Sequence, residues 1–427
     1  MNLQDKTLGD RTQGVHGELE TQSPQDRKDR KWGELKELMD TAWRGSMEFR
    51  NRMEKAGLNP TDIRSFEQWP EIPVFRKKEL IGLQTTGAKI GGLLTCDIGD
   101  LQRIYQSPGP IFDPEGRGDD YWGWTEGFYA AGFRKKDVVQ MTFGYHLTPA
   151  GLMLEQPLRE LGCAVIPAGP GNTAVQIELM TELPVTGFVG MASYLRVIAD
   201  KAASSGLDLK KDFHLRVAFV AAERLSESLR RGLELDFGML VRQGYGTADL
   251  GCVAYECPHL GGMHTASRCY VEICDPETGR PLPLGETGEV VATPFTHAYP
   301  LIRFATGDLS YFVDRECACG RTSLKLGGIV GRVDDTAKVK GQFIYPAQAA
   351  EVMAAFPGVS GWQIVVENPK GKDALFLKVR LDGDFDLKKC ETLFQKRLKL
   401  RPVIEILPKG EDMPEDAPLL VDNRHFS

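Results

Sequence analysis

Thiol and imidazole side chains in the second half of the sequence could bind a metal ion. Cys257 and His264 lie close together in the sequence, and Cys317 and Cys319 form a Cys-X-Cys pair. Three thiolates and one imidazole complete the tetrahedral coordination of zinc without an open position, which is typical of a structural site. Free cysteines are also commonly buried as small hydrophobic residues, so the pattern alone leaves both interpretations open. Other side chains of the region could compete as ligands, namely Cys252, His259, Cys269 and Cys274.

Three short motifs could recognise a nucleotide. In Gln243-Gly-Tyr-Gly-Thr-Ala-Asp249, two glycines allow close approach to a flat ligand, and the ring of Tyr245 can stack on a base. Asp308 ends a Thr-Gly-Asp motif and could accept the hydroxyls of a ribose, and Arg332 could hold a hydroxyl or a phosphate. Each motif by itself is weak evidence for a nucleotide-binding site. Their order and spacing, followed by a small C-terminal domain, strengthen the interpretation.

The segments that precede these motifs alternate between strand and helix. We expect strands at 138–143, 164–166, 187–190 and 215–220, and helices at 152–161, 176–183 and 194–203. Such alternation predicts right-handed βαβ units and a mostly parallel sheet, and therefore an α/β fold. Between 261 and 326 the segments become short and rich in β-branched residues and turn dipeptides, which indicates a small antiparallel sheet or barrel.

The sequence predicts three regions along the chain. Residues 1–31 are polar, and we expect a frayed arm there, followed by a helix from Trp32 to Ala56. Residues 32–332 form the predicted large domain. Residues 333–427 form a predicted small mobile α+β domain of βαββαβ order, with helices at 347–356 and 387–398.

Length, charge and cysteine count exclude several classes of protein. A chain of 427 residues is too long for one ordinary core. The formal net charge of −7 argues against a nucleic-acid partner, because phosphate neutralisation needs a basic face. No apolar stretch approaches the roughly 20 residues that cross a bilayer, and the first thirty residues lack the apolar region of a secretory signal. Nine cysteines are an odd number, which does not suggest a disulfide framework, so we expect a cytoplasmic protein.

With these motifs in place, the chain resembles the phenylacetate–CoA ligase branch of the adenylate-forming enzymes. That superfamily carries a Tyr-Gly-X-Thr-Glu motif, a Thr-Gly-Asp motif and a Gly-Arg-X-Asp-Asp hinge before a mobile C-terminal domain. Further segments similar to the phenylacetate–CoA ligases are 69–80, 171–173, 193–194, 256–257, 300–303 and 317–321. The resemblance extends from about Trp32 to the end of the chain.

The resemblance implies a reaction and a set of site residues. ATP and a carboxylate, of an aryl or similarly flat acid, would give an acyl-adenylate and pyrophosphate, and CoA would then give a thioester. The implied cofactors and ions are ATP or AMP, Mg²⁺, CoA and a structural Zn²⁺, and the resemblance also implies a homodimer. The implied nucleotide-binding residues are Ala222, Glu223, Tyr245, Gly246, Asp308 and Arg332, with Asp334 as the hinge. The implied acyl pocket is Tyr145, His146, Leu147, Gly190 and Met191, and the implied zinc ligands are Cys257, His264, Cys317 and Cys319.

Three departures from the family pattern concern phosphate handling. The glycine-rich phosphate loop corresponds here to 105–114, where two prolines remove N–H donors and Asp113 adds a negative charge. Ala248 replaces a hydroxyl, although Asp249 can still hold Mg²⁺. The family's C-terminal lysine is replaced by Asp416 or Pro418, and Lys409 is the nearest substitute. The departures leave two alternatives: an ATP-dependent acid–CoA ligase, with Asp249 and Lys409 as catalytic residues, or a degenerate paralogue that binds a nucleotide or aromatic ligand without adenylating.

Overall fold

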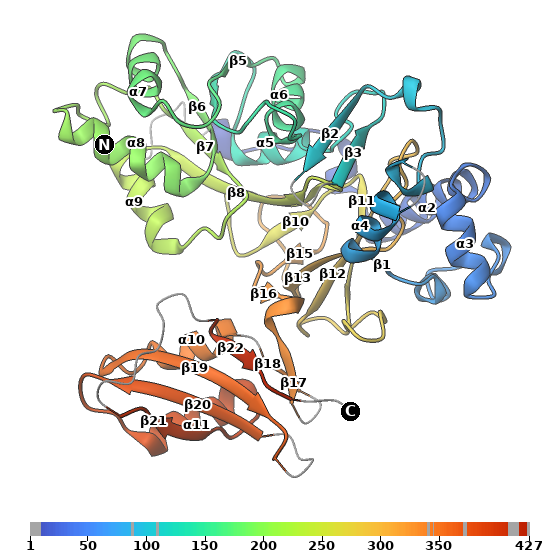
Figure 1. Ribbon diagram of the computed structural model, residues 1–427. Coiled ribbons are helices and arrows are strands. Elements are labelled where there is room, and N and C mark those ends of the chain that lie inside the picture. Colours follow the sequence, from blue (N-terminus) through green and yellow to red (C-terminus); the bar gives the residue numbers. More distant parts are fainter. Residues whose placement is uncertain are drawn as a thin grey trace. The chain divides into compact units, whose positions relative to one another are not determined.

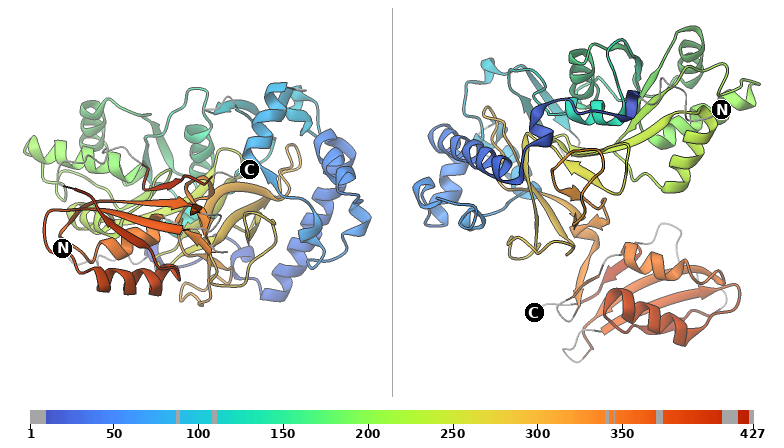
Figure 2. Two further views of the ribbon diagram at one scale, coloured as in Figure 1. Left: turned by 60° about the horizontal axis from the view of Figure 1, so that its bottom comes forward. Right: turned by 180° about the vertical axis from the view of Figure 1, so that it is seen from behind.

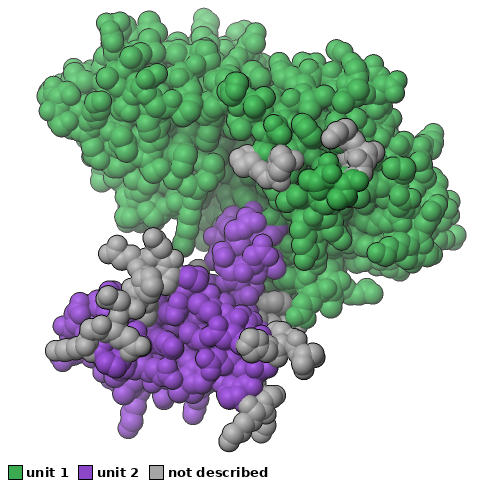
Figure 3. All heavy atoms as spheres, viewed as in Figure 1, with its two compact units in different colours: residues 1–306, 310–328 green, residues 307–309, 329–427 purple. Residues whose placement is uncertain are grey.

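The computed structural model describes residues 10–86, 89–107, 111–339, 342–344, 346–369, 374–408 and 418–424 (Figure 1). The chain divides into two compact units (Figure 3). Unit 1 comprises Met1–Thr306 and Ser310–Gly328, and unit 2 comprises Gly307–Leu309 and Ile329–Ser427. Each unit has its own buried apolar core. Within the described ranges, no helix is both long enough and apolar enough to cross a membrane.

A sheet of nine strands forms the centre of unit 1 (Figure 1). Its parallel part follows the order β5 (Ala164–Pro167), β4 (Val138–Met141), β6 (Gly187–Gly190), β7 (Val217–Val220) and β8 (Leu240–Thr247). Strands β6 and β7 are buried throughout. Burial on both faces is what a parallel sheet covered by helices requires, and it explains their continuous apolar runs.

Helices connect the parallel strands, as the α/β prediction requires. They are α6 (Ala150–Glu160), α7 (Thr173–Glu182), α8 (Ala192–Ser204) and α9 (Glu227–Phe237), and α5 (Thr125–Ala131) precedes the first of these strands along the chain. The predicted alternation of strand and helix is confirmed, with bounds shifted by a few residues. Helix α9 was not predicted, although its signals are present. Ser226 accepts a hydrogen bond from the Leu229 N–H at the start, and Gly238 adopts a φ of 69° at the end.

Antiparallel strands extend the large sheet, and a second sheet is antiparallel except for β1 (Phe75–Arg76), which pairs with β13 (Phe304–Ser310) in parallel. β9 (Gly251–Glu256), β10 (Met263–Thr265), β15 (Lys325–Leu326) and β14 (Phe312–Val313) follow β8. The second sheet contains β1, β13, β12 (Gly288–Pro294) and β11 (Cys269–Cys274). A separate hairpin consists of β2 (Arg103–Ser107) and β3 (Ile111–Glu115). The short antiparallel segments predicted between 261 and 326 are therefore confirmed.

The N-terminal segment differs from the prediction in two ways. The expected single helix is divided into α2 (Pro24–Gly45) and α3 (Met47–Lys55), because Ser46 leaves helical geometry and its hydroxyl caps α3 at the Phe49 N–H. The expected frayed arm is wrong for residues 10–31. Arg11 pairs with Asp137 at 2.7 Å, and the buried Glu20 pairs with Arg321, so long-range ion pairs hold this polar segment in place.

Unit 2 is built on a four-stranded sheet of order β21-β20-β19-β22. Its strands are β19 (Val359–Glu367), β20 (Ala374–Leu381), β21 (Val403–Ile406) and β22 (Leu420–Asp422). Helices α10 (Pro346–Met353) and α11 (Leu387–Leu398) lie side by side against the sheet (Figure 2). A small hairpin of β17 (Ala337–Val339) and β18 (Gln342–Ile344) precedes them. The α+β composition predicted for this region is confirmed.

Candidate functional site

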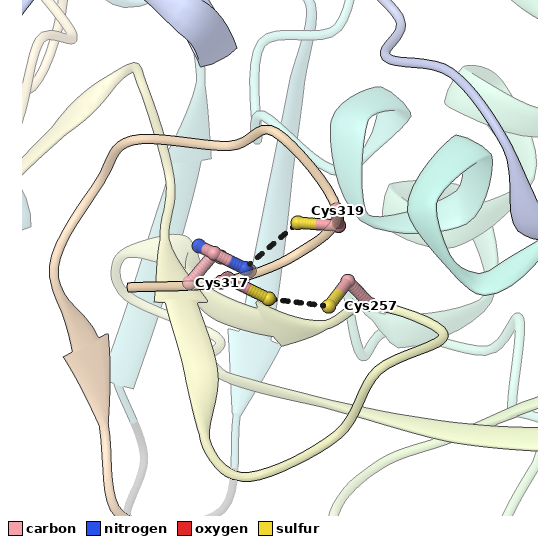
Figure 4. A group of neighbouring side chains, drawn as sticks. Cys257, Cys317 and Cys319 are labelled. Atoms are coloured by element: carbon pink, nitrogen blue, oxygen red, sulfur yellow. Dashed lines mark hydrogen bonds between the residues drawn. The ribbon is translucent and has the colours of Figure 1, made fainter. Parts of the chain in front are cut away.

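Four potential metal ligands come together in unit 1 (Figure 4). The ligand atoms of Cys257, His264, Cys317 and Cys319 all lie within 4.8 Å of one another. The Sγ atoms of Cys257 and Cys317 are 3.5 Å apart, and Sγ of Cys319 is 3.3 Å from Nε2 of His264. With Zn–S bonds of about 2.3 Å, the sulfurs of a tetrahedral site lie roughly 3.8 Å apart, so the donor set and its spacing fit zinc.

Groups around this cluster orient and stabilise its ligands. Nδ1 of His264 lies 3.4 Å from the Ser323 hydroxyl, which fixes the ring so that Nε2 faces the cluster. The Arg321 N–H donates to Sγ of Cys319, and the ammonium of the buried Lys325 lies 3.9 Å from Sγ of Cys317. The hydrogen bond between the two thiols lowers the pKa of Cys319 and raises the pKa of Cys257, because the neighbouring sulfurs share a proton. Within the described ranges, Cys252, His259, Cys269 and Cys274 belong to no such cluster.

The nucleotide and acyl residues implied by the resemblance follow the carboxyl ends of neighbouring parallel strands. Tyr145, His146 and Leu147 follow β4, Gly190 and Met191 stand at the end of β6, Ala222 and Glu223 follow β7, and Tyr245 and Gly246 end β8. Because these strands are adjacent and parallel, their carboxyl ends meet at one edge of the sheet. Ligands of α/β sheets bind at this edge.

The turn after β7 has a strained backbone and a fixed carboxylate. Ala222 adopts a φ of 69°, which is uncommon for a residue with a Cβ atom. The Glu223 carboxylate accepts hydrogen bonds from the N–H of Ser193 at 2.6 Å and from its hydroxyl at 2.8 Å. The turn is therefore tied to the start of α8 and kept close to the sheet edge.

The glycines of β8 are required by the protein's own packing. A Cβ atom on Gly244 would lie 2.3 Å from the ring of Phe219, and one on Gly246 would lie 2.1 Å from the carbonyl oxygen of Gly251. The predicted role of these glycines in admitting a ligand is thus not needed to explain them. Tyr245 is held by its hydroxyl, 3.1 Å from the Thr306 hydroxyl, which fixes the orientation of the ring.

The residues implied for the acyl pocket differ in exposure. Gly190 is buried, and a Cβ atom there would lie 1.9 Å from the Thr142 hydroxyl. Leu147 and Met191, in contrast, are 58% and 39% exposed. Exposed apolar side chains beside the carboxyl edge of the sheet provide a surface on which a flat apolar group could lie.

The segment predicted to correspond to the family's phosphate loop contains strands β2 and β3, and its residues 108–110 lie outside the described residues. Asp113 is 1% exposed, and the Ser107 hydroxyl donates to its carboxylate. Burial, and after it the charge of Asp249, raise the pKa of Asp113 to about 7. Nζ of Lys77 lies 3.0 Å from Oδ2 of Asp249. Lys77 had no role in the sequence prediction, although it lies in the segment 69–80 that resembles the family.

In unit 2, the implied ribose residues form an ion pair. Asp308 and Arg332 are register partners on β13 and β16 (Gly331–Arg332), and their side chains meet at 2.7 Å. Asp334 lies in a short 3₁₀ helix, Val333–Asp335. A carboxylate and a guanidinium side by side offer an acceptor and a donor to vicinal hydroxyls. Lys409, the predicted catalytic substitute, lies outside the described residues.

Comparisons with known proteins agree with this geometry. A family model for AMP-binding enzymes matches residues 125–294. The phenylacetate-coenzyme A ligase of Thermus thermophilus is 30% identical over 364 residues, which is 82% of this chain and 80% of the relative. The enzyme of the same name from Escherichia coli is 27% identical and covers 87% of each chain. A solved open conformation of 2-hydroxyisobutyryl-CoA ligase superposes with a TM-score of 0.86 at 23% identity, covering 95% of this chain and 93% of that one, and so shares the fold.

Proposed function

Because the chain belongs to the phenylacetate-coenzyme A ligase family, we propose that it joins an aryl carboxylic acid to coenzyme A in an ATP-dependent reaction. In the first step, a carboxylate oxygen attacks the α-phosphorus of ATP and pyrophosphate leaves. In the second, the CoA thiol loses its proton and attacks the acyl carbon, and AMP leaves. The observation that carries this proposal is the convergence of four loops at the carboxyl edge of the parallel sheet.

Each step needs particular side chains of this chain. We assign the ring of Tyr245 to the adenine, because its hydroxyl is fixed by Thr306 and its face can stack. Asp308 and Arg332 would hold the ribose, and their ion pair would open to accept its hydroxyls. Asp334 would be the hinge that lets unit 2 turn between the two half-reactions. Leu147 and Met191 would line the acyl side, which suits an apolar aryl group.

Two ions complete the proposal. Asp249 fits Mg²⁺, because its Oδ1 atom is buried and accepts no hydrogen bond from the described residues. When bound, the ion would neutralise phosphate charge. The Cys₃His cluster would hold a structural Zn²⁺, because its four donors leave no open position. The cytoplasmic location and the homodimer that the family resemblance implies stay proposals.

Pyrophosphate release and thioester formation test the proposal directly. We expect turnover with at least one of a panel of arylacetates, benzoates and fatty acids, on the order of several per second if the site is intact. Asp308→Ala should raise the KM for ATP, whereas Asp314→Ala, an exposed acid after β14, should leave it unchanged. Absence of both products with every acid would contradict a ligase.

The alternative is a paralogue that binds nucleotide without adenylating, and the buried Asp113 favours it, since its carboxylate repels phosphate oxygens in the ionised form. Melting experiments separate the two functions. A ligand at about 100 times its Kd stabilises by roughly 2.7 kcal/mol. The alternative is favoured if AMP or adenosine raises the melting temperature more than MgATP does and no pyrophosphate is released.

A further inference from the structure

Helix α8 begins with a residue that cannot cap it. The N-cap position is Met191, whose side chain lacks the oxygen that usually accepts a hydrogen bond from the first N–H groups of a helix. Glu223, in the turn after β7, supplies that acceptor. Its Oε1 atom accepts from the Ser193 N–H at 2.6 Å, and its Oε2 atom accepts from the Ser193 hydroxyl at 2.8 Å. The carboxylate also lies at the positive end of the helix dipole, which strengthens this contact.

The contact joins two loops that the family resemblance assigns to different substrates. Met191 belongs to the implied acyl pocket, whereas Ala222 and Glu223 belong to the implied nucleotide-binding residues. Ala222 adopts a φ of 69°, and a residue with a Cβ atom keeps such a conformation only where the surrounding structure holds it. The contact between Glu223 and Ser193 therefore fixes the nucleotide turn and the start of α8 together.

The same helix turn is also tied to the loop after β5. The Tyr194 hydroxyl donates to the Gly171 carbonyl at 2.7 Å and lies 3.3 Å from the Thr173 hydroxyl. These contacts give a structural role to 171–173 and 193–194, two of the segments that are similar to the phenylacetate–CoA ligases. The start of α8 is therefore held from two directions, by the loop after β5 and by the turn after β7.

We propose that Glu223 is a positioning residue that joins the nucleotide turn to the acyl-side loop through Ser193 and does not itself contact the nucleotide. Each of its carboxylate oxygens already accepts a hydrogen bond from Ser193. The inference rests on the proposed function and deepens it, because it makes the two halves of the site depend on one contact. A nucleotide that orders the turn after β7 also orders the loop that carries Met191. By linkage, an acid that orders this loop strengthens nucleotide binding by the same factor.

Calorimetric titration of the full-length protein with AMP measures this role without acid or CoA. We expect Glu223→Ala to bind AMP about fivefold more weakly, which corresponds to the loss of one typical hydrogen bond. Glu223→Gln should keep most of the affinity, because an amide can accept from the Ser193 N–H and donate to its hydroxyl oxygen. Ser204→Ala removes a hydroxyl at the other end of α8 and is the control, which should bind AMP as the parent does.

Two further measurements test the link between the loops. Addition of Ser193→Ala to Glu223→Ala should weaken AMP binding no further, because the two residues act through one contact. In hydrogen exchange, AMP should protect the backbone N–H groups at 192–195 in the parent protein and protect them much less in Glu223→Ala. Melting curves of each variant without nucleotide check that it folds.

The outcomes separate this inference from the proposed function. If the parent protein and Glu223→Ala bind AMP equally, the positioning role is overturned and the proposed function stands. Equal weakening in Glu223→Gln and Glu223→Ala would also overturn it, because the carboxylate itself would then bind the nucleotide. Unchanged exchange at 192–195 in the AMP-bound parent would overturn the link between the loops. Absence of AMP binding in the parent would overturn the proposed function and this inference together.

Discussion

Replacement of Glu20 by alanine should destabilise unit 1 strongly, although this residue lies in a polar N-terminal segment. Its carboxylate is 2.5 Å from Nε of Arg321, and the two side chains are 0% and 1% exposed. The carboxylate also accepts hydrogen bonds from the Tyr255 hydroxyl at 3.1 Å and from the His16 N–H at 2.6 Å. Alanine would leave the guanidinium buried without its counter-charge.

The expected loss follows from that burial. Removal of one partner of a buried ion pair costs about 3–5 kcal/mol, because the other charge stays desolvated. For a unit of roughly three hundred residues, an unfolding entropy of about 2.1 cal/mol/K per residue converts this loss to a fall in Tm of about 5–8 °C. Urea denaturation followed by circular dichroism measures the free energy, and calorimetry measures the Tm.

Two further variants isolate the cause. Glu18→Ala changes an exposed carboxylate in the same short 3₁₀ helix, and its effect should stay within about 0.5 kcal/mol. The double variant Glu20→Leu with Arg321→Met replaces both charges by apolar groups and should recover much of the loss. If Glu20→Ala lowers the free energy of unfolding by less than about 1 kcal/mol, the reasoning is refuted, because the segment would then not be docked as the ion pair requires.

The remaining predictions concern the metal cluster, a buried lysine and the hinge. Purified protein should contain about one zinc per chain, and chelation or Cys319→Ser should lower the Tm, whereas Cys96→Ser should not; metal-free protein with unchanged melting would contradict the site. Burial lowers the pKa of Lys31 from 10.5 to about 8, so the folded protein loses this proton before the unfolded chain does. Stability relative to Lys31→Met should then rise above pH 8, by roughly 2 kcal/mol at pH 9.5, and a difference in stability that does not change with pH would refute the shift. Asp334→Pro should spare adenylate formation and suppress thioester formation, while Asp334→Ala spares both; equal loss of both steps in the proline variant would argue against a hinge.

The order of strands and helices in the first half of unit 1 could be predicted from the sequence, because each element carries its own signal. The inner parallel strands β6 and β7 are short apolar runs buried on both faces, and a helix such as α8 shows one apolar stripe. Once neighbouring strands are known to be parallel, their carboxyl ends must share an edge. The place of Tyr145, Gly190, Ala222 and Tyr245 at one edge therefore follows from local patterns and topology.

Two features of the helices that the sequence analysis did not predict have local signals in the sequence. Ser226 and Gly238 cap α9, and both residue types are typical of helix ends. Ser46 breaks the first long helix, because its hydroxyl competes for the backbone N–H of the next turn. In both cases the residue acts on a helix end within four positions of itself, so the feature can be predicted from the local sequence.

Tertiary structure alone decided which distant groups meet. The ion pair of Glu20 and Arg321 joins residues 301 positions apart, and the contact of Lys77 with Asp249 spans 172 positions. Local periodicity reports which face of an element is buried, but it carries no information about the partner that face will contact. The sequence by itself determined the fold class and the candidate zinc ligands, whose types and spacing are chemical signals. The docked N-terminal segment and the ion pair of Lys77 with Asp249 form only when folding brings distant charges together, because the energy of such a pair depends on how much water folding excludes around it.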